Sequence, residues 1–168
     1  MIVFRRTTID DIQMIQTLAR RIWEEAFNQL LSNAQIEYML EMMYSSKVIE
    51  AEIARGTIWE LIYLEGEVVG YISYSFEKDN SVKLSKIYIS VENRGTGIAD
   101  AALKRVIRYA MENDRNCVYL TVNKGNKRAI RAYEKSGFSI TESVVTDIGH
   151  GFVMDDYIMK YYCNNKKM

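Results

Sequence analysis

The chain is poor in residues that build metal centres and disulfide frameworks, and it has no proline. Its 168 residues include one histidine, His150, and two cysteines, Cys117 and Cys163. So few ligands leave no Cys/His cluster, and a metal site made of protein side chains is not expected. The cysteines fit a reduced cytoplasm, with Cys117 as a small core residue. His150 stands between two glycines, where an exposed turn is expected.

Long apolar runs are also missing. No stretch approaches the ~20 residues that a membrane-spanning helix needs. Arg5, Arg6 and Asp10 interrupt the first residues, which therefore lack the pattern of a signal peptide. We expect a cytoplasmic protein with no membrane partner.

The composition is that of a globular domain, with 48% hydrophobic and 26% charged residues. A chain of this length without linkers or internal repeats is expected to form one domain over residues 1–168. Its polar end, residues 162–168, is expected to fray.

The net charge is zero, but the charges are unevenly distributed. Residues 94–135 carry ten Lys/Arg against four Asp/Glu, a net charge of +6. Residues 8–67 carry four Lys/Arg against eleven Asp/Glu, a net charge of −7. A basic half suits an anionic cofactor and an acidic half suits a cationic amine, although solvated helix faces also explain most of these charges. No nucleic-acid partner is expected, because such partners usually require a net basic domain.

Hydrophobic periodicity predicts elements in the order β-α-α-β-β-β-α-β-α-β-β, with a short third helix over residues 46–55. Thr8-x-x-Asp11 and Ser32-x-x-Gln35 mark helix starts, as does Asn126. Glu65-Gly66 marks a two-residue hairpin. The expected strands cover residues 3–5, 57–64, 67–76, 82–90, 117–123, 138–145 and 152–162. The other expected helices cover residues 12–30, 36–43 and 98–113, and the stretch between Asn126 and Gly137.

The strand over residues 82–90 breaks its own alternation. Val82 and Leu84 occupy even positions, whereas Ile87 and Ile89 occupy odd ones. A β-bulge produces such a shift, and a strand buried on both faces would hide it. We expect a bulge that leaves backbone donors unpaired beside the following turn.

A glycine-rich turn over residues 91–99, between this strand and the next helix, is the most informative segment. Backbone N–H groups at a helix start lack intrahelical partners and lie at the positive end of the dipole, so they can bind a phosphate. Gly95 and Gly97 allow close approach of the ligand, and Arg94 adds a charge-assisted donor. The turn is not G-x-G-x-x-G, since Asp100 stands at the third glycine position, and no Gly-Lys-Ser/Thr makes it a P-loop. An ordinary glycine-rich turn is the alternative.

Two motifs in register resemble the same family. Arg94, Gly97 and Ala99 resemble the acyl-CoA-binding signature Arg/Gln-x-x-Gly-x-Gly/Ala of the GCN5-related N-acetyltransferases (GNAT family). A later block resembles that family's N-x-x-N-x-x-A-x-x-x-Y-x-x-x-G-F pattern at every anchor: Asn123, Asn126, Ala129, Tyr133, Gly137 and Phe138. The resemblance covers roughly residues 3–162, nearly the whole chain.

The resemblance implies a fold and a cofactor. The fold would be α/β (α+β), a mixed, mostly antiparallel sheet of six to seven strands flanked by four to five helices. A bulged strand would splay from its parallel neighbour. The cofactor would be acetyl-CoA as acetyl donor, without a metal. The implied cofactor-binding residues are Ile87, Tyr88, Ile89, Arg94, Gly95, Thr96, Gly97, Ile98, Ala99, Asn123, Asn126 and Ala129.

The resemblance also implies direct attack of a neutral amine on acetyl-CoA, with Tyr133 as general acid for the departing thiolate. A packed helix aromatic is the alternative role for Tyr133. The general base is not assigned. Many family members have a glutamate near Ser85, whereas this chain has none over residues 83–86. Glu24, Glu25 or a water chain could serve instead.

For the acceptor, residues 23–27, 44–53, 87–89 and 156–159 resemble bacterial spermidine/spermine-type acetyltransferases. This resemblance implies that the acceptor is the primary amine of a small molecule, and more narrowly a polyamine. The implied substrate-binding residues, here called the acceptor wall, are Trp23, Glu24, Glu25 and Tyr157. Three alternatives stay open: acylation of protein N-termini or lysines, acylation of aminoacyl-tRNA, or a non-catalytic CoA-binding module. Dimers are frequent in the family, and the aromatic last strand offers an edge for a homodimer.

Overall fold

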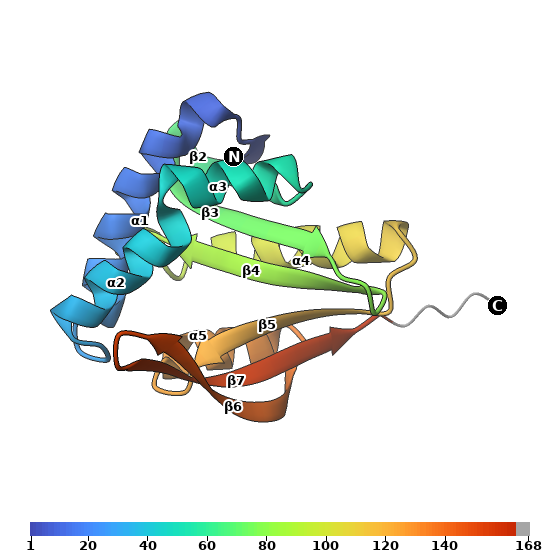
Figure 1. Ribbon diagram of the computed structural model, residues 1–168. Coiled ribbons are helices and arrows are strands. Elements are labelled where there is room, and N and C mark those ends of the chain that lie inside the picture. Colours follow the sequence, from blue (N-terminus) through green and yellow to red (C-terminus); the bar gives the residue numbers. More distant parts are fainter. Residues whose placement is uncertain (164–168) are drawn as a thin grey trace. The chain divides into compact units, whose positions relative to one another are not determined.

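The computed structural model describes residues 1–163 as seven strands, five α-helices and two 3-10 turns (Figure 1). The order of elements is the predicted one, and the third helix is present. In chain order they are β1 (Ile2–Arg6), η1 (Ile9–Asp11), α1 (Ile12–Phe27), α2 (Asn33–Tyr44), α3 (Ser46–Ala54), β2 (Ile58–Leu64), β3 (Glu67–Phe76), β4 (Ser81–Ile89), η2 (Val91–Asn93), α4 (Ile98–Glu112), β5 (Cys117–Asn123), α5 (Lys127–Lys135), β6 (Ser139–Gly149) and β7 (Phe152–Tyr162). None of these helices is long and apolar enough to span a bilayer.

The strands form a mixed sheet in the order β1-β2-β3-β4-β5-β7-β6. The pairs β1/β2, β2/β3, β5/β7 and β6/β7 are antiparallel, and β4/β5 is parallel. The parallel pairing covers three residues of each strand, Ser81–Lys83 beside Cys117–Tyr119. The predicted α/β (α+β) class with a mixed, mostly antiparallel sheet is therefore confirmed.

The chain divides into two compact units. The first contains residues 1–75 and 86–99, and the second contains residues 76–85 and the chain from Asp100 onward. β4 therefore contributes residues to both units.

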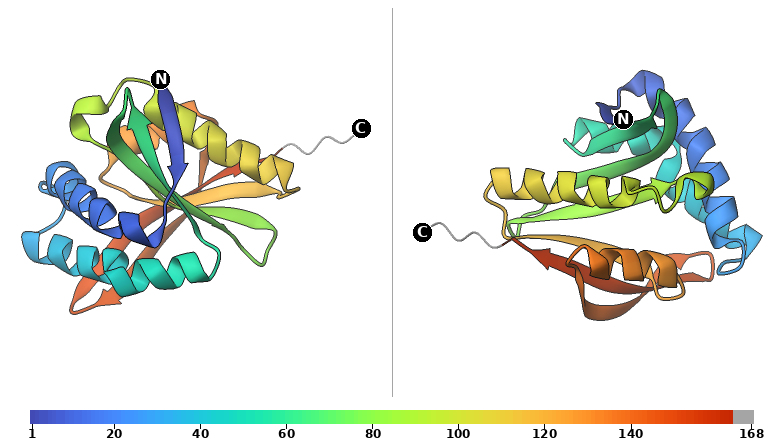
Figure 2. Two further views of the ribbon diagram at one scale, coloured as in Figure 1. Left: turned by 90° about the horizontal axis from the view of Figure 1, so that it is seen from above. Right: turned by 180° about the vertical axis from the view of Figure 1, so that it is seen from behind.

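In the first unit, α2 and α3 cover one face of β2 and β3 (Figure 1, Figure 2). The ring of Tyr44, at the end of α2, lies 6.1 Å from that of Trp59 on β2 and 5.8 Å from that of Tyr71 on β3. The amphipathic pattern predicted for α1 is confirmed, because its apolar residues are buried: Ile12, Ile15, Leu18, Ala19, Ile22, Trp23 and Phe27.

Local signals predicted from the sequence define the helix starts of this unit. The Ser32 hydroxyl accepts a hydrogen bond from the Gln35 N–H at 3.1 Å and caps α2. The Ser45 hydroxyl accepts from the Val48 N–H at 3.3 Å and caps α3. After α3 the chain turns at Gly56, whose φ of +97° is in the left-handed region.

The two-residue hairpin between β2 and β3 is also confirmed. Glu65 and Gly66 have φ angles of +50° and +84°. Two consecutive left-handed residues match the right-handed twist of the flanking strands. Glu65 additionally pairs with the N-terminal ammonium group of Met1.

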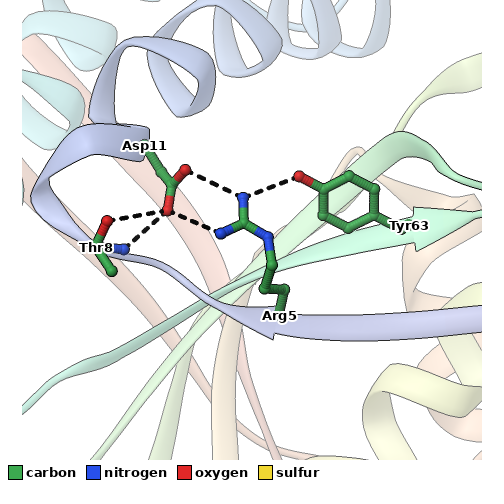
Figure 3. A network of polar contacts seen from close by, with 4 residues as sticks. All are labelled: Arg5, Thr8, Asp11 and Tyr63. Atoms are coloured by element: carbon green, nitrogen blue, oxygen red, sulfur yellow. Dashed lines mark hydrogen bonds and ion pairs between the residues drawn. The ribbon is translucent and has the colours of Figure 1, made fainter.

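A polar network stabilises the entry to α1 (Figure 3). The Arg5 guanidinium donates to the two carboxylate oxygens of Asp11 at 3.1 and 3.4 Å, and to the Tyr63 hydroxyl at 3.0 Å. The Asp11 carboxylate also accepts from the Thr8 N–H at 2.9 Å, as a capping box requires. The Thr8 N–H lowers the pKa of Asp11, and Arg5 lowers it further against the opposing effect of burial.

We expect Asp11→Ala to lower the free energy of unfolding by about 1 kcal/mol, the usual cost of losing a helix cap. Because the folded pKa of Asp11 lies below its ordinary value, this stabilisation is complete above about pH 4 and is lost as the pH falls through the folded pKa. Urea unfolding at pH 7 and pH 3 measures both effects. Asp10→Ala, at an exposed neighbouring position, is the control. Equal losses for the two variants at pH 7 would contradict the assignment.

β3 and β4 approach each other closely at Gly70. A Cβ at this position would lie 2.4 Å from the carbonyl oxygen of Tyr88 and 3.3 Å from the Cα of Ile89. Next to this contact, the Ser90 N–H donates to the Val69 carbonyl at 2.8 Å. The absence of a side chain at Gly70 therefore positions the β4 backbone at the residues predicted to bind the cofactor.

The burial pattern of β4 differs from the predicted one. The even series of buried positions continues to Lys86, which is 6% exposed, whereas Ile87 is only half-buried. The Lys86 ammonium lies 5.0 Å from the Trp59 ring centroid and 5.4 Å from that of Tyr44. Aromatic faces attract cations, so a lysine can occupy this buried position. The sequence had predicted that the even series of buried residues ends before it. The predicted bulge in this strand stays a prediction.

In the second unit, α5 lies against one face of β5 and β7 (Figure 1, Figure 2). The Phe138 ring lies 6.2 Å from that of Tyr133 on α5 and 5.7 Å from that of Tyr161 on β7. Gly137, with φ +99°, ends the helix, and a Cβ there would lie 3.0 Å from the Tyr161 ring. The helix end predicted at Gly137 is confirmed.

The end of the second unit differs in two ways from the prediction. β6 continues to Gly149 rather than residue 145, because Gly149, His150 and Gly151 form a left-handed turn that pairs it with β7. Fraying does not begin at residue 162: Tyr162 belongs to β7, and the buried Cys163 donates its N–H to the Asn116 carbonyl at 2.8 Å. Residues 164–168 of the predicted tail lie outside the described residues.

Candidate active site

The glycine-rich turn is an open loop between η2 and α4 in the first unit. Arg94 is extended, with φ −70° and ψ 150°. Gly95 and Gly97 have φ angles of +78° and +83°, and nothing lies within 4 Å of a Cβ placed on either residue. The two glycines are therefore required by backbone conformation. The space beside them is open, so a ligand can reach the peptide groups.

Short polar contacts stabilise this loop from within. The Asn93 side-chain amide donates to the buried Ser90 hydroxyl at 2.7 Å, and the Thr96 hydroxyl donates to the Asn93 carbonyl at 2.5 Å. Within the described part of the chain, the N–H groups of Gly95, Thr96 and Gly97 donate to no other protein group. A preformed loop at a helix start, whose peptide N–H groups have no protein acceptor, is an arrangement that binds phosphate oxygens.

The predicted cofactor-binding segment of β4, Ile87–Ile89, borders an aromatic cluster. The Tyr88 ring lies 5.5 Å from that of Trp23, 5.6 Å from that of Tyr71 and 6.3 Å from that of Phe27. These contacts join α1, β3 and β4 next to the segment. Aromatic packing of this kind leaves the backbone of β4 little freedom to move.

The three residues of α1 that were predicted to line an acceptor wall differ in their exposure. Trp23 is 3% exposed and donates its indole N–H to the Tyr44 hydroxyl at 3.2 Å, so it belongs to the core. Glu24 and Glu25 follow it on the exposed side of α1, and Glu24 lies 3.5 Å from Arg20. The helical turn explains the separation, since adjacent residues point about 100° apart.

The hydroxyl of Tyr44 continues this buried network. It lies 2.8 Å from the Tyr71 hydroxyl, and both tyrosines are fully enclosed. Burial raises the pKa of both phenols well above the ordinary value. Both groups are therefore hydrogen-bonded structural hydroxyls at neutral pH.

The second unit carries the residues of the later motif. The Asn126 side chain accepts from the Ala129 N–H at 3.3 Å and caps α5 as predicted. The Asn123 side chain accepts from the Gly125 N–H at 2.8 Å. The two asparagines thus shape the turn between β5 and α5. Their predicted contacts with the cofactor stay predictions.

Tyr133 lies on α5 and is 9% exposed. Burial raises the pKa of its phenol. The hydroxyl is therefore protonated throughout the physiological range, which is the state that a general acid requires. Its ring contact with Phe138 also supports the packing role considered from the sequence, and the two roles are compatible.

Tyr157 lies beside a charged pair at the end of the β5/β7 ladder. The Lys124 ammonium lies 2.8 Å from the Asp155 carboxylate and 5.5 Å from the centroid of the Tyr157 ring. The Lys124 N–H also donates to the Asp155 carbonyl at 3.1 Å. Tyr157 itself is half-buried.

Asp156 was not identified as a site residue from the sequence. It pairs with Asn123 across the β5/β7 ladder and is 6% exposed. Burial raises the pKa of its carboxyl to about 6, with a further increase from Asp155 and an opposing effect of Lys124. A strongly perturbed carboxyl beside motif residues is a feature of functional sites. The sequence signal that could have identified Asp156 is an aspartate at a strand position where the two-residue period predicts a buried side chain.

With this geometry described, sequence comparison identifies the family. A model described as "Acetyltransferase (GNAT) family" matches residues 12–138. This chain belongs to the GNAT family. The matched range contains the loop from Arg94 to Ala99 and the later motif from Asn123 to Phe138, whereas Asp156 lies beyond it.

Two GNAT-type relatives show different coverage. An uncharacterized N-acetyltransferase of Mycobacterium tuberculosis is 36% identical over 95 residues, which are 56% of this chain and 60% of the relative. The chain therefore covers less than two thirds of the length of that protein. The thialysine N-epsilon-acetyltransferase of Bos taurus is 30% identical over 129 residues, which are 71% of this chain and 75% of the relative.

The GNAT fold is also found in solved structures. The structure of a PaiA N-acetyltransferase from Thermoplasma acidophilum, in complex with coenzyme A, aligns with a TM-score of 0.83. It is 21% identical in sequence, and the alignment covers 96% of this chain and 99% of that chain. At this identity the likeness shows the fold.

Proposed function

We propose that the protein is an acetyl-CoA-dependent N-acetyltransferase that transfers an acetyl group to a primary amine of a small molecule. The observation that carries this proposal is the loop Arg94–Ala99, in which two left-handed glycines leave peptide N–H groups open at a helix start. Membership of the GNAT family supports the same assignment.

In this proposal the first unit binds the donor. The peptide N–H groups of Gly95–Ala99 and the guanidinium of Arg94 would bind the diphosphate of acetyl-CoA. The backbone of Ile87–Ile89 would pair with the pantetheine arm, and one of these N–H groups would polarise the thioester carbonyl. A pre-aimed donor of this kind lowers the barrier of other acyl transfers by roughly 3 kcal/mol. Asn123, Asn126 and Ala129 are the proposed cofactor contacts of the second unit.

The chemistry we propose is direct attack in a ternary complex. The amine nitrogen attacks the thioester carbon, the C–S bond breaks, and the Tyr133 hydroxyl donates its proton to the departing thiolate. Its burial keeps the phenol protonated until that step. No part of this scheme needs a metal.

As the acceptor we propose a primary amine at the end of an alkyl chain, as in the side chain of lysine. The bovine relative is named for acetylation of the ε-nitrogen of thialysine. The net charge of −7 over residues 8–67 favours a cation as well. A polyamine is the narrower form of the same proposal, with Glu24, Glu25 and Tyr157 as candidate contacts. Trp23 would support them from the core. A homodimer and a cytoplasmic location also stay proposals.

We expect the purified protein to release free thiol from acetyl-CoA only when a primary amine is present. Thialysine, lysine and spermidine are the first acceptors to test, and mass spectrometry of the products identifies the acetylated nitrogen. Acceptor-dependent turnover would exclude a non-catalytic CoA-binding module. Binding of acetyl-CoA without turnover of any amine, peptide N-terminus or aminoacyl-tRNA would instead favour that module.

A further inference from the structure

The β5/β7 ladder of the second unit contains a largely buried aspartate, Asp156, that forms no ion pair within the described residues. Asp156 is 6% exposed, yet its side chain has no hydrogen-bond or ion-pair partner within residues 1–163. Its carboxylate oxygens are not among the fully buried polar atoms of the described residues, so they keep some access to solvent. A largely buried carboxyl with a raised pKa and reachable oxygens is suited to proton transfer.

The neighbouring Asp155 makes the contrast clear. Asp155 is exposed, and its carboxylate lies 2.8 Å from the Lys124 ammonium. Adjacent residues of a strand point to opposite faces, so the Lys124 ammonium forms its ion pair with Asp155 and not with Asp156. Two aspartates that are adjacent in sequence thus have opposite environments.

The position of Asp156 relates it to the proposed chemistry. Asp156 pairs with Asn123, so their side chains share one face of the ladder. Tyr161 lies on the other face, where it contacts Phe138, which in turn contacts Tyr133 of α5. Tyr133 therefore packs against the face opposite to Asp156. In the proposed scheme the amine would reach the thioester carbon from the side of Asp156, and the leaving thiolate would take its proton from the side of Tyr133.

We propose that Asp156 is the general base of the reaction, binding the acceptor as its ammonium and removing one proton from it. This inference rests on the proposed acetyltransferase activity and assigns the role that the sequence left open among Glu24, Glu25 and water.

The proton balance of this scheme is complete. The carboxylate of Asp156 accepts one proton from the ammonium, and the resulting amine attacks the thioester carbon. Collapse of the tetrahedral intermediate breaks the C–S bond, and the thiolate takes the Tyr133 proton. The second proton on nitrogen is lost to the Tyr133 phenolate, which restores the phenol. The first proton leaves from Asp156 to water, so the net products are amide, thiol and one proton.

The charges around Asp156 predict how its activity depends on pH. Burial raises its pKa to about 6, Asp155 raises it further, and Lys124 lowers it. On the face of the sheet that carries Asp156, Val144 of β6 is its direct partner, and Glu142 lies two residues further along β6. Lys160 of β7 and its partner Tyr119 of β5 are on the same face, four residues along β7 from Asp156. Since only the ionised carboxylate can accept a proton, kcat/KM should fall as the pH drops below about 6.

The test compares wild type, Asp156→Asn and Asp155→Asn with acetyl-CoA and the best acceptor among thialysine, lysine and spermidine. We expect Asp156→Asn to lower kcat/KM about 100-fold at pH 7.5, within the usual range for loss of a general base, with acetyl-CoA affinity unchanged. Asp155→Asn should keep most of the activity. It should move the acidic limb of the profile to lower pH, because it removes a negative charge that raises the Asp156 pKa.

Thermal unfolding separates this role from a structural one. The folded pKa of Asp156 lies above its ordinary value, so its charge opposes folding above about pH 6. Neutral Asp156→Asn should therefore unfold at an equal or higher temperature than wild type at pH 8. Loss of activity together with a lower unfolding temperature would overturn the proposal, as would unchanged kcat/KM in Asp156→Asn. If wild type itself acetylates no amine, the proposed function fails, and this inference fails with it.

Discussion

Replacing Gly97 by valine should weaken acetyl-CoA binding by roughly 100-fold or more, equivalent to losing two charge-assisted hydrogen bonds of about 1.5 kcal/mol each. Gly97 has φ +83°, a conformation that a β-branched residue avoids at a cost of about 1–2 kcal/mol. To relieve this strain, the loop would rotate its peptide groups away from the phosphate-binding direction. Isothermal titration calorimetry with acetyl-CoA measures the loss directly.

The hairpin residue Gly66 provides a matched control for this experiment. Its φ is +84°, and nothing lies within 4 Å of a Cβ placed there, as at Gly97. Gly66→Val should therefore lose a similar amount of stability and bind acetyl-CoA normally. If both variants bind as wild type does, the peptide groups of residues 95–99 do not bind the diphosphate. The central assignment of the donor site would then be wrong.

Tyr133→Phe should lower kcat about 100-fold, the lower range for loss of a general acid, with little change in acetyl-CoA affinity. The substitution removes one hydroxyl and keeps the ring that packs against Phe138. The fold and the donor site should therefore be retained. Burial raises the pKa of Tyr133, so in wild type this phenol should cause no loss of activity on the alkaline side up to its ordinary pKa of about 10.

Tyr161→Phe is the control for Tyr133→Phe. Tyr161 contacts the same Phe138 ring from β7, and its hydroxyl has no role in the proposed reaction. Steady-state kinetics and calorimetry of both variants separate an effect on chemistry from an effect on packing. Full turnover in Tyr133→Phe would leave the phenol with a packing role only.

The features that were predictable from the sequence depend on short-range interactions. The serine cap of α2, the Glu65-Gly66 hairpin, the Asn126 cap and the helix end at Gly137 each involve residues at most a few positions apart. Such signals depend on backbone dihedral angles and local hydrogen bonds, which the tertiary environment modifies little. For this reason the element order was predicted correctly.

The burial of some residues could not be predicted, because residues distant in sequence determine their environment. The apolar series was interpreted as shifting between Leu84 and Ile87, but Lys86 continues the even series, because its ammonium lies near the rings of Tyr44 and Trp59. Trp23 was assigned to a substrate wall, but the Tyr44 hydroxyl accepts its indole N–H in the core. In both cases a polar or amphipathic group is buried because a partner from another element compensates it.

By itself, the sequence of this protein determined the order of the secondary-structure elements, the glycine-rich turn with its required left-handed residues, and the family. Periodicity, capping and glycine conformation are local properties, so one chain without its fold specifies them. Only the tertiary structure distinguished Asp155 from Asp156, because strand pairing exposes the first beside Lys124 and buries the second without a partner. Burial and charge pairing arise from contacts between elements, and they are the reason why Asp156 and not Asp155 is proposed as the general base.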